Sequence, residues 1–180
     1  MSKLRLAGVI KESIVDGPGI RFVVFGQGCP HRCPGCQNPQ THDFDGGYET
    51  DTENILAAIQ KNPLLKGITL SGGDPFVQPE AMAELAEKAH GLGLDVVTYT
   101  GYTIEELLAG LDEHPGWRQL LEQTDTLVDG RFLLEQKSML LKFRGSKNQR
   151  IIDSKASLEQ GRAVEKPFDD EIIIEFPKDI

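Results

Sequence analysis

Short apolar runs alternate with amphipathic helical patterns along most of this 180-residue chain. Each apolar run is followed by a polar, glycine-rich segment before the next helical pattern begins. The predicted strands span residues 20–25, 67–70, 95–98 and 126–128. This order predicts parallel strands joined by helices, because a parallel pair needs a long crossover connection. There are too few units for a closed eight-stranded barrel. The expected fold class is therefore α/β, a partial, open parallel β/α barrel.

Helical patterns are predicted over residues 52–62, over residues 79–90 and after Thr103. Thr103 and Glu106 have the spacing of a capping box. The second pattern contains an apolar stripe made of Met82, Leu85, Ala86 and Ala89. We expect residues 1–153 to form one domain. Residues 154–180 are expected to be a C-terminal tail of unknown role, in which residues 171–176 have the composition of a strand.

The polar segments after the strands hold most of the residues suited to chemistry. They are residues 29–36, 71–75, 98–102 and 129–130. In parallel α/β sheets the carboxyl ends of the strands lie at one edge, where sites usually form. We therefore expect these four segments to meet on one rim of the fold.

All three cysteines of the chain lie in one short loop, as Cys29, Cys33 and Cys36. An odd number of cysteines argues against a disulfide framework. Three thiolates in this spacing can bind three corners of a [4Fe–4S] cluster and leave the fourth iron without a cysteine. Such an iron can chelate a molecule that offers an amino and a carboxylate group, as S-adenosylmethionine does. Two alternatives stay open here, namely a structural zinc completed by one histidine and a cluster of reactive thiols.

The charge balance bears on partners and location. The chain has 28 Asp and Glu against 19 Lys and Arg, a net charge of −9. An acidic surface argues against a nucleic-acid partner. The first residues contain no apolar stretch typical of a signal peptide, and no apolar run has the length of a membrane span. We expect a cytoplasmic protein that is not bound to a membrane.

Several motifs resemble those of a known family. Residues 16–21 (DGPGIR) and 28–39 (GCPHRCPGCQNP) closely resemble the glycyl-radical activating enzymes of the radical S-adenosylmethionine superfamily. Residues 71–75 (SGGDP), 100–102 (TGY) and 128–132 (VDGRF), together with most of 143–153, narrow the resemblance to the members that activate anaerobic ribonucleoside-triphosphate reductase. The resemblance covers residues 7–153.

This resemblance implies a role for each matched position. Cys29, Cys33 and Cys36 would ligate the cluster and act catalytically through it. The positions implied in binding S-adenosylmethionine are Gly35, Cys36 and Gln37 for the adenosyl group, Ser71, Gly72, Gly73 and Asp74 for the methionine amino group, and Thr100 and Asp129 for the carboxylate. Many superfamily members have an aromatic residue where this chain has Gly35, so the adenine contact is unassigned. Asp74 also stands where the wider superfamily often has Glu.

The resemblance also implies an activity and partners. S-adenosylmethionine would be cleaved at the [4Fe–4S] cluster, and the resulting radical would take a hydrogen atom from a glycine of the large subunit of the reductase. A flavodoxin or ferredoxin would supply the electron. The alternatives are a radical enzyme acting on a small heterocycle, similar to 7-carboxy-7-deazaguanine synthase, and a non-catalytic interaction module stabilised by zinc. Residues 16–21 are expected to form either a tight turn or a lip for the glycine loop of the reductase.

Overall fold

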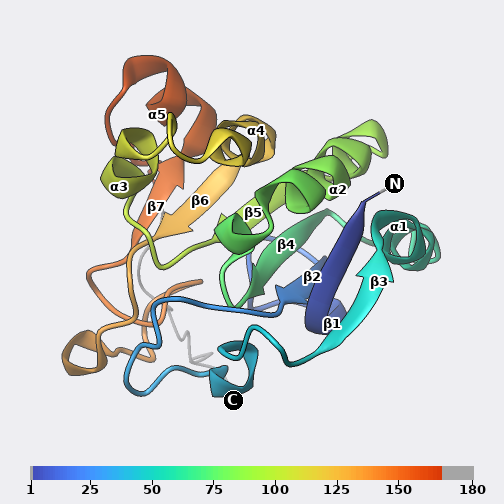
Figure 1. Ribbon diagram of the computed structural model, residues 1–180, viewed down its shortest axis with the longest axis horizontal. Coiled ribbons are helices and arrows are strands. Elements are labelled where there is room, and N and C mark those ends of the chain that lie inside the picture. The colour runs from blue at the N-terminus through green and yellow to red at the C-terminus, as the bar shows by residue number, and fades with distance from the viewer. Residues whose placement is uncertain (1, 168–180) are drawn as a thin grey trace, which may run out of the picture.

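The computed structural model describes residues 2–167, which form an open seven-stranded sheet covered by helices (Figure 1). The strand order in the sheet is β3-β1-β2-β4-β5-β6-β7. The strands are β1 (Lys3–Ser13), β2 (Arg21–Gly26), β3 (Tyr48–Asp51), β4 (Gly67–Gly72), β5 (Asp95–Tyr99), β6 (Thr126–Asp129) and β7 (Arg150–Asp153).

The centre of the sheet is parallel. Strands β2, β4, β5 and β6 pair in parallel, in that order, and correspond to the four predicted strands. The predicted α/β fold class, a partial, open parallel β/α barrel, is therefore confirmed, in the form of a mostly parallel open sheet. Strands β1, β3 and β7 were not predicted, and they extend the sheet with antiparallel pairs at both sides. Antiparallel neighbours need no helical crossover, so the strand–helix pattern gave no sign of them.

Five α-helices pack against one face of the sheet (Figure 1). They are α1 (Thr52–Gln60), α2 (Pro79–Gly91), α3 (Ile104–Ala109), α4 (Pro115–Gln123) and α5 (Ser154–Gln160). The predicted stripe on α2 is confirmed, since Met82, Leu85, Ala86 and Ala89 are all fully buried. The predicted capping box of α3 is also present, with both reciprocal hydrogen bonds between Thr103 and Glu106.

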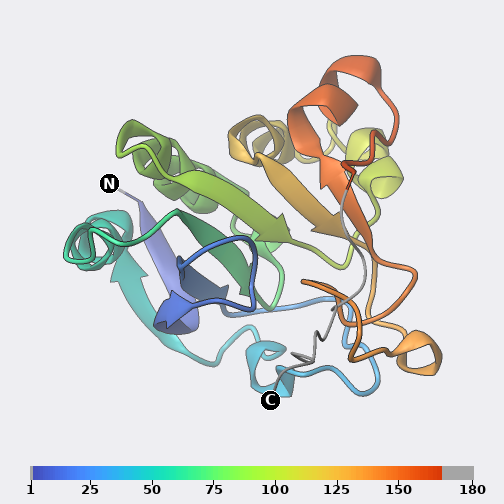
Figure 2. The same cartoon turned by 180° about the vertical axis from the view of Figure 1, so that it is seen from behind.

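The two faces of the parallel strands have different neighbours. Ile68, Leu70 and Val96 belong to the apolar core under the helices. Thr69 lies on the other face of β4, and its hydroxyl donates to the Asp16 carbonyl in the β1–β2 connection, 2.7 Å away. Figure 2 shows this connection in front of the parallel strands. The face without helices is thus partly covered by a loop, which leaves the rim at the carboxyl ends of the strands accessible.

Residues 154–167 continue from β7 into helix α5, which contacts α4, and then return to the edge of the sheet. Helix α5 begins with Ser154, whose hydroxyl donates to the Leu121 carbonyl in α4 at 2.7 Å. Farther on, Glu165 pairs with Ile152 in an antiparallel bridge. The predicted strand over residues 171–176 lies outside the described residues. Within residues 2–167, no helix combines the length and apolar character needed to cross a bilayer.

Candidate functional site

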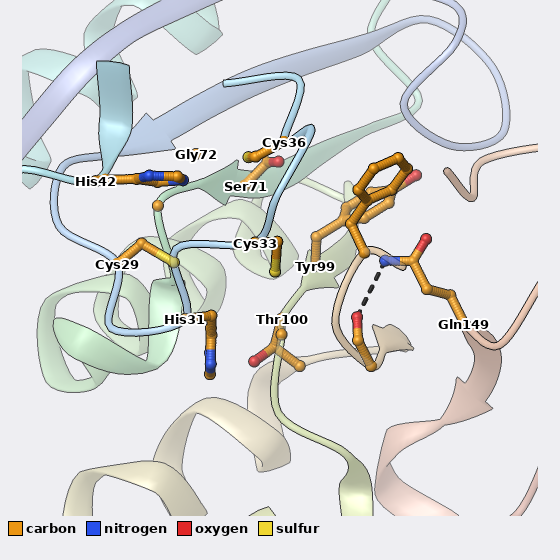
Figure 3. A pocket seen from close by; sticks show the side chains of 14 residues that line it. Cys29, His31, Cys33, Cys36, His42, Ser71, Gly72, Tyr99, Thr100 and Gln149 are labelled. Atoms are coloured by element: carbon orange, nitrogen blue, oxygen red, sulfur yellow. Dashed lines mark hydrogen bonds between the residues drawn. The ribbon is translucent and has the colours of Figure 1, made fainter. Parts of the chain in front are cut away.

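A pocket opens where β2, β4 and β5 end, and the loop with the three cysteines forms one of its walls (Figure 3). Seven of the residues singled out in the sequence line it, namely Cys29, Cys33, Cys36, Ser71, Gly72, Gly73 and Thr100. They come from three segments that are far apart in the sequence. The structure thus brings the cysteine loop together with the two polar segments that follow β4 and β5.

Backbone hydrogen bonds give the cysteine loop its shape. Gly28 has a φ of 107°, a conformation that costs other residues free energy, and its N–H donates to the Thr41 carbonyl at 2.7 Å. The N–H of Cys36 donates to the Cys33 carbonyl at 3.1 Å, which closes a tight turn between two cysteines. Backbone hydrogen bonds within the loop and to neighbouring segments therefore hold the segment that presents the thiols.

The three thiols differ in their surroundings. Cys29 is buried, whereas Cys33 and Cys36 are partly exposed, and none of them forms a disulfide. Burial raises the pKa of the Cys29 thiol, an effect that the backbone N–H groups of His31 and Arg32 reduce. The N–H of Asn38 lies 3.4 Å from Cys36 Sγ, as a donor to it.

The donor set suits an iron–sulfur cluster. Three free cysteines line a single open pocket, and a backbone amide points at the sulfur of one of them. Hydrogen bonds to ligating sulfur are one of the means by which proteins tune such clusters. In the part of the chain that the structure describes, no group of three or more His, Cys, Asp or Glu side chains is placed so that it could hold a single metal ion.

Two glycines bring the segment after β4 into direct backbone contact with the cysteine loop. The Gly73 N–H donates to the Gly26 carbonyl at 2.8 Å, and the Asp74 N–H donates to the Gly28 carbonyl at 2.9 Å. A Cβ on Gly73 would overlap the carbonyl of Gly28, and Gly72 has a φ of 98°. Glycine is therefore required at position 73 because two backbones approach closely there, and not because the residue adopts a positive φ.

Gly73→Ala is expected to separate this backbone contact and to destabilise the protein by about 1–3 kcal/mol or more, as overpacking does. Iron and sulfide content after anaerobic reconstitution should fall together with the midpoint of thermal unfolding. Gly91→Ala is the matched control, because a Cβ there meets no atom within 4 Å. Normal iron content and an unchanged midpoint in Gly73→Ala would contradict the assigned contact.

The carboxylate of Asp74 does not line the pocket. The residue is 1% exposed, and its oxygens accept from the Phe76 N–H, the Thr100 hydroxyl and the Gly101 N–H at 2.9–3.0 Å. The Thr100 side chain lines the pocket while its hydroxyl is committed to Asp74. Asp74 thus joins the ends of β4 and β5 behind the pocket wall.

Three other residues singled out in the sequence lie near the pocket but do not line it. Asp129 is fully buried, accepts from the Ile104 N–H at 2.8 Å and pairs with Arg150 at 2.6 Å. The hydrogen bond with Glu105 makes the largest contribution to raising the pKa of Arg150, and the hydrogen bond with Asp129 raises it further. Gly35 is exposed in the cysteine loop, and Gln37 lines a neighbouring groove.

The structure adds pocket residues to which the sequence analysis assigned no site role. They are His31, His42, Tyr99, Gly101, Gly130, Phe132 and Gln149. Tyr99 is the last residue of β5 and belongs to the polar segment 98–102 that was expected at this rim, and burial raises the pKa of its phenol. Phe132 and Gln149 lie in the long connection between β6 and β7, which has no periodic pattern. The amide of Gln149 donates to the Gly130 carbonyl at 3.0 Å and fixes this part of the wall (Figure 3).

Comparisons with known proteins agree with this donor set. A family model described as a 4Fe-4S single cluster domain matches residues 15–152. The anaerobic ribonucleoside-triphosphate reductase-activating protein of Vibrio cholerae is 37% identical over 146 residues, which cover 77% of this chain and 90% of that protein. The protein of the same name from Escherichia coli K12 is 34% identical over 145 residues, covering 76% of this chain and 90% of that protein.

A relative from a bacteriophage shows the same similarity. The anaerobic ribonucleoside-triphosphate reductase-activating protein of Enterobacteria phage T4 is 32% identical over 146 residues, covering 76% of this chain and 86% of that protein. Among solved structures, QueE from Escherichia coli aligns with a TM-score of 0.44 and 17% identity, over 56% of this chain and 53% of that chain. That structural similarity is too weak to support an assignment.

Proposed function

The chain belongs to the family of anaerobic ribonucleoside-triphosphate reductase-activating proteins, and from this membership we propose that it places a glycyl radical on the reductase by reductive cleavage of S-adenosylmethionine at a [4Fe–4S] cluster. The observation that carries the proposal is the shared pocket of the three cysteines and the glycine-rich segment after β4. This membership also favours an activase over the heterocycle enzyme and the zinc module.

Different residues of the pocket would bind the cluster and S-adenosylmethionine. Cys29, Cys33 and Cys36 would hold three irons of the cluster, which leaves the fourth iron open to a chelating ligand. When bound, the cluster and S-adenosylmethionine supply a one-electron cleavage of the C5′–S bond and an adenosyl radical that takes a hydrogen atom from glycine. The protein supplies position and a site protected from water.

The segment at the end of β4 would hold the methionine end of S-adenosylmethionine. Ser71, Gly72 and Gly73 line the pocket, and their backbone can approach a ligand closely because two of them have no side chain. Backbone carbonyl groups accept from an amino group. Gly35 and Gln37 in the cysteine loop are proposed to contact the adenosyl group, and Phe132 offers an aromatic face in the same pocket.

The proposal includes partners. The large subunit of the anaerobic ribonucleoside-triphosphate reductase is the substrate, and its glycine loop must reach the pocket. A flavodoxin or a ferredoxin would serve as electron donor, since ferredoxin clusters reach potentials near about −400 mV. We place the reaction in the cytoplasm.

Product analysis tests the proposed function. The anaerobically reconstituted protein is mixed with dithionite and S-adenosylmethionine, with and without the cognate reductase, and 5′-deoxyadenosine and methionine are quantified. We expect both products in equal amounts, and a glycyl radical only when the reductase is present. A protein that holds one zinc per chain and forms neither product would refute the proposal.

A further inference from the structure

His31 connects the cysteine loop to Asp74. Its Nε2 lies 2.7 Å from Asp74 Oδ2, and the two side chains are 4% and 0% exposed. The imidazole also packs edge-on against the Tyr102 ring, with the centroids 4.5 Å apart at 80°. A Cβ on Gly101 would overlap the imidazole, so the lack of a side chain at this position, just after β5, leaves room for the His31 ring. The His31 side chain is thus buried and in contact with both Asp74 and Tyr102, so it has one defined position in the cysteine loop.

Asp74 receives hydrogen bonds from three segments of the chain. His31 reaches it from the cysteine loop, Phe76 from the turn after β4, and Thr100 with Gly101 from the end of β5. Together these four donors surround both oxygens of a carboxylate that is 1% exposed. A carboxylate with this many buried protein donors has little capacity left for a ligand.

We infer that His31 is a positioning residue that, through Asp74, fixes the cysteine loop against the segment that holds the methionine end of S-adenosylmethionine. This inference rests on the proposed function and deepens it. Asp74 then acts from behind the pocket wall, while the backbone of residues 71–73 meets the ligand. The buried pair thus adds a side-chain link to the backbone contacts that join the cysteine loop to the S-adenosylmethionine site.

In other metal sites, residues that hydrogen-bond to the ligands without touching the metal orient those ligands. Removing such a hydrogen bond typically costs about 10–100-fold in metal affinity or activity. The same physical reason applies here, since residues 29–36 keep their place relative to residues 71–73 through backbone contacts and the His31–Asp74 pair.

The test measures S-adenosylmethionine affinity by anaerobic calorimetry, on reconstituted protein of known iron content. His31→Ala is expected to weaken S-adenosylmethionine binding by about 10–100-fold, and His31→Gln should recover part of it, because its amide can donate to Asp74. In an Asp74→Asn background His31→Ala should add little, since interacting residues are non-additive. Hydrogen exchange of residues 29–36 in the cluster-free protein should accelerate in His31→Ala.

His90→Ala provides a matched control. His90 Nε2 lies at the same 2.7 Å distance from Asp125 Oδ2, but its side chain is 27% exposed and does not line the pocket. Its loss should leave both S-adenosylmethionine affinity and loop exchange unchanged. If His31→Ala binds S-adenosylmethionine like the wild type, the inference is overturned while the proposed function stands. If the wild type itself fails to bind S-adenosylmethionine, the proposed function fails first.

Discussion

Cys33→Ala is expected to abolish cluster binding and activation of the reductase while leaving the fold intact. Cys33 is partly exposed and lines the pocket, so its loss removes a ligand without opening a cavity in the core. Two remaining thiolates cannot replace the three that an open-iron cluster requires. Iron content, the visible absorption of the cluster and 5′-deoxyadenosine formation should all fall to background, whereas the circular dichroism of the unloaded protein should not change.

Arg32→Ala is the control for this prediction, because Arg32 lies in the same loop, its side chain is exposed and it is not one of the proposed cluster ligands. It should bind iron like the wild type. Retention of a cluster with normal stoichiometry in Cys33→Ala would remove this residue from the ligand set. Unfolding of the cluster-free Cys33→Ala protein would instead show that the thiol supports the fold.

Arg21→Ala is expected to produce the largest loss of stability. Arg21 is fully buried, pairs with Asp95, and donates to the Thr69 hydroxyl and to the carbonyl groups of Pro18 and Ile68 at 2.7–2.9 Å. The Asp95 side chain is 38% exposed, so the loss comes mainly from the buried Thr69 hydroxyl and Ile68 carbonyl, and leaving such a group without its donor costs about 1–3 kcal/mol each. For a domain of this size the midpoint of thermal unfolding should fall by about 10 °C.

Arg131→Ala is the comparison for Arg21→Ala. Arg131 forms an ion pair with Glu106 at 3.1 Å, but both side chains are about 40% exposed, and such surface pairs contribute only about 0–1 kcal/mol. Differential scanning calorimetry of the two variants should therefore separate them clearly. Equal midpoints for both variants would show that the buried network of Arg21 does not hold the β1–β2 connection. The contacts of Arg21 favour the tight-turn interpretation of residues 16–21 over the lip for a partner loop.

The parallel centre of the fold could be predicted because its strands are short, apolar and followed by glycine-rich segments. Strand β1 begins with a weak alternation, since Leu4 and Leu6 are buried whereas Lys3, Arg5 and Ala7 between and beside them are less buried. Strand β7 is four residues long and follows a 20-residue connection without periodicity, so no pattern marks it. Helix α4, in which Trp117 is buried, begins at Pro115, and a proline is as typical of a turn as of the first turn of a helix.

The site likewise has features that the sequence predicts and contacts that it does not. The cysteine spacing and the glycine-rich segments fix which loops meet, because parallel strands bring their carboxyl ends to one edge. Which side chains then touch depends on tertiary packing. His31 and Asp74 are 43 positions apart, and nothing in their spacing predicts a contact. Phe132 and Gln149 reach the pocket from the irregular β6–β7 connection, where sequence gives no orientation.

The most direct test of the central claim is electron paramagnetic resonance of the anaerobically reconstituted, dithionite-reduced protein, recorded with and without S-adenosylmethionine. An iron that lacks a cysteine ligand is open to the amino and carboxylate groups of S-adenosylmethionine, so its binding should alter the spectrum of the cluster. We predict a reduced [4Fe–4S] signal that shifts when S-adenosylmethionine is added. A cluster signal that S-adenosylmethionine leaves unchanged would contradict the account, because the fourth iron would then be closed to the ligand.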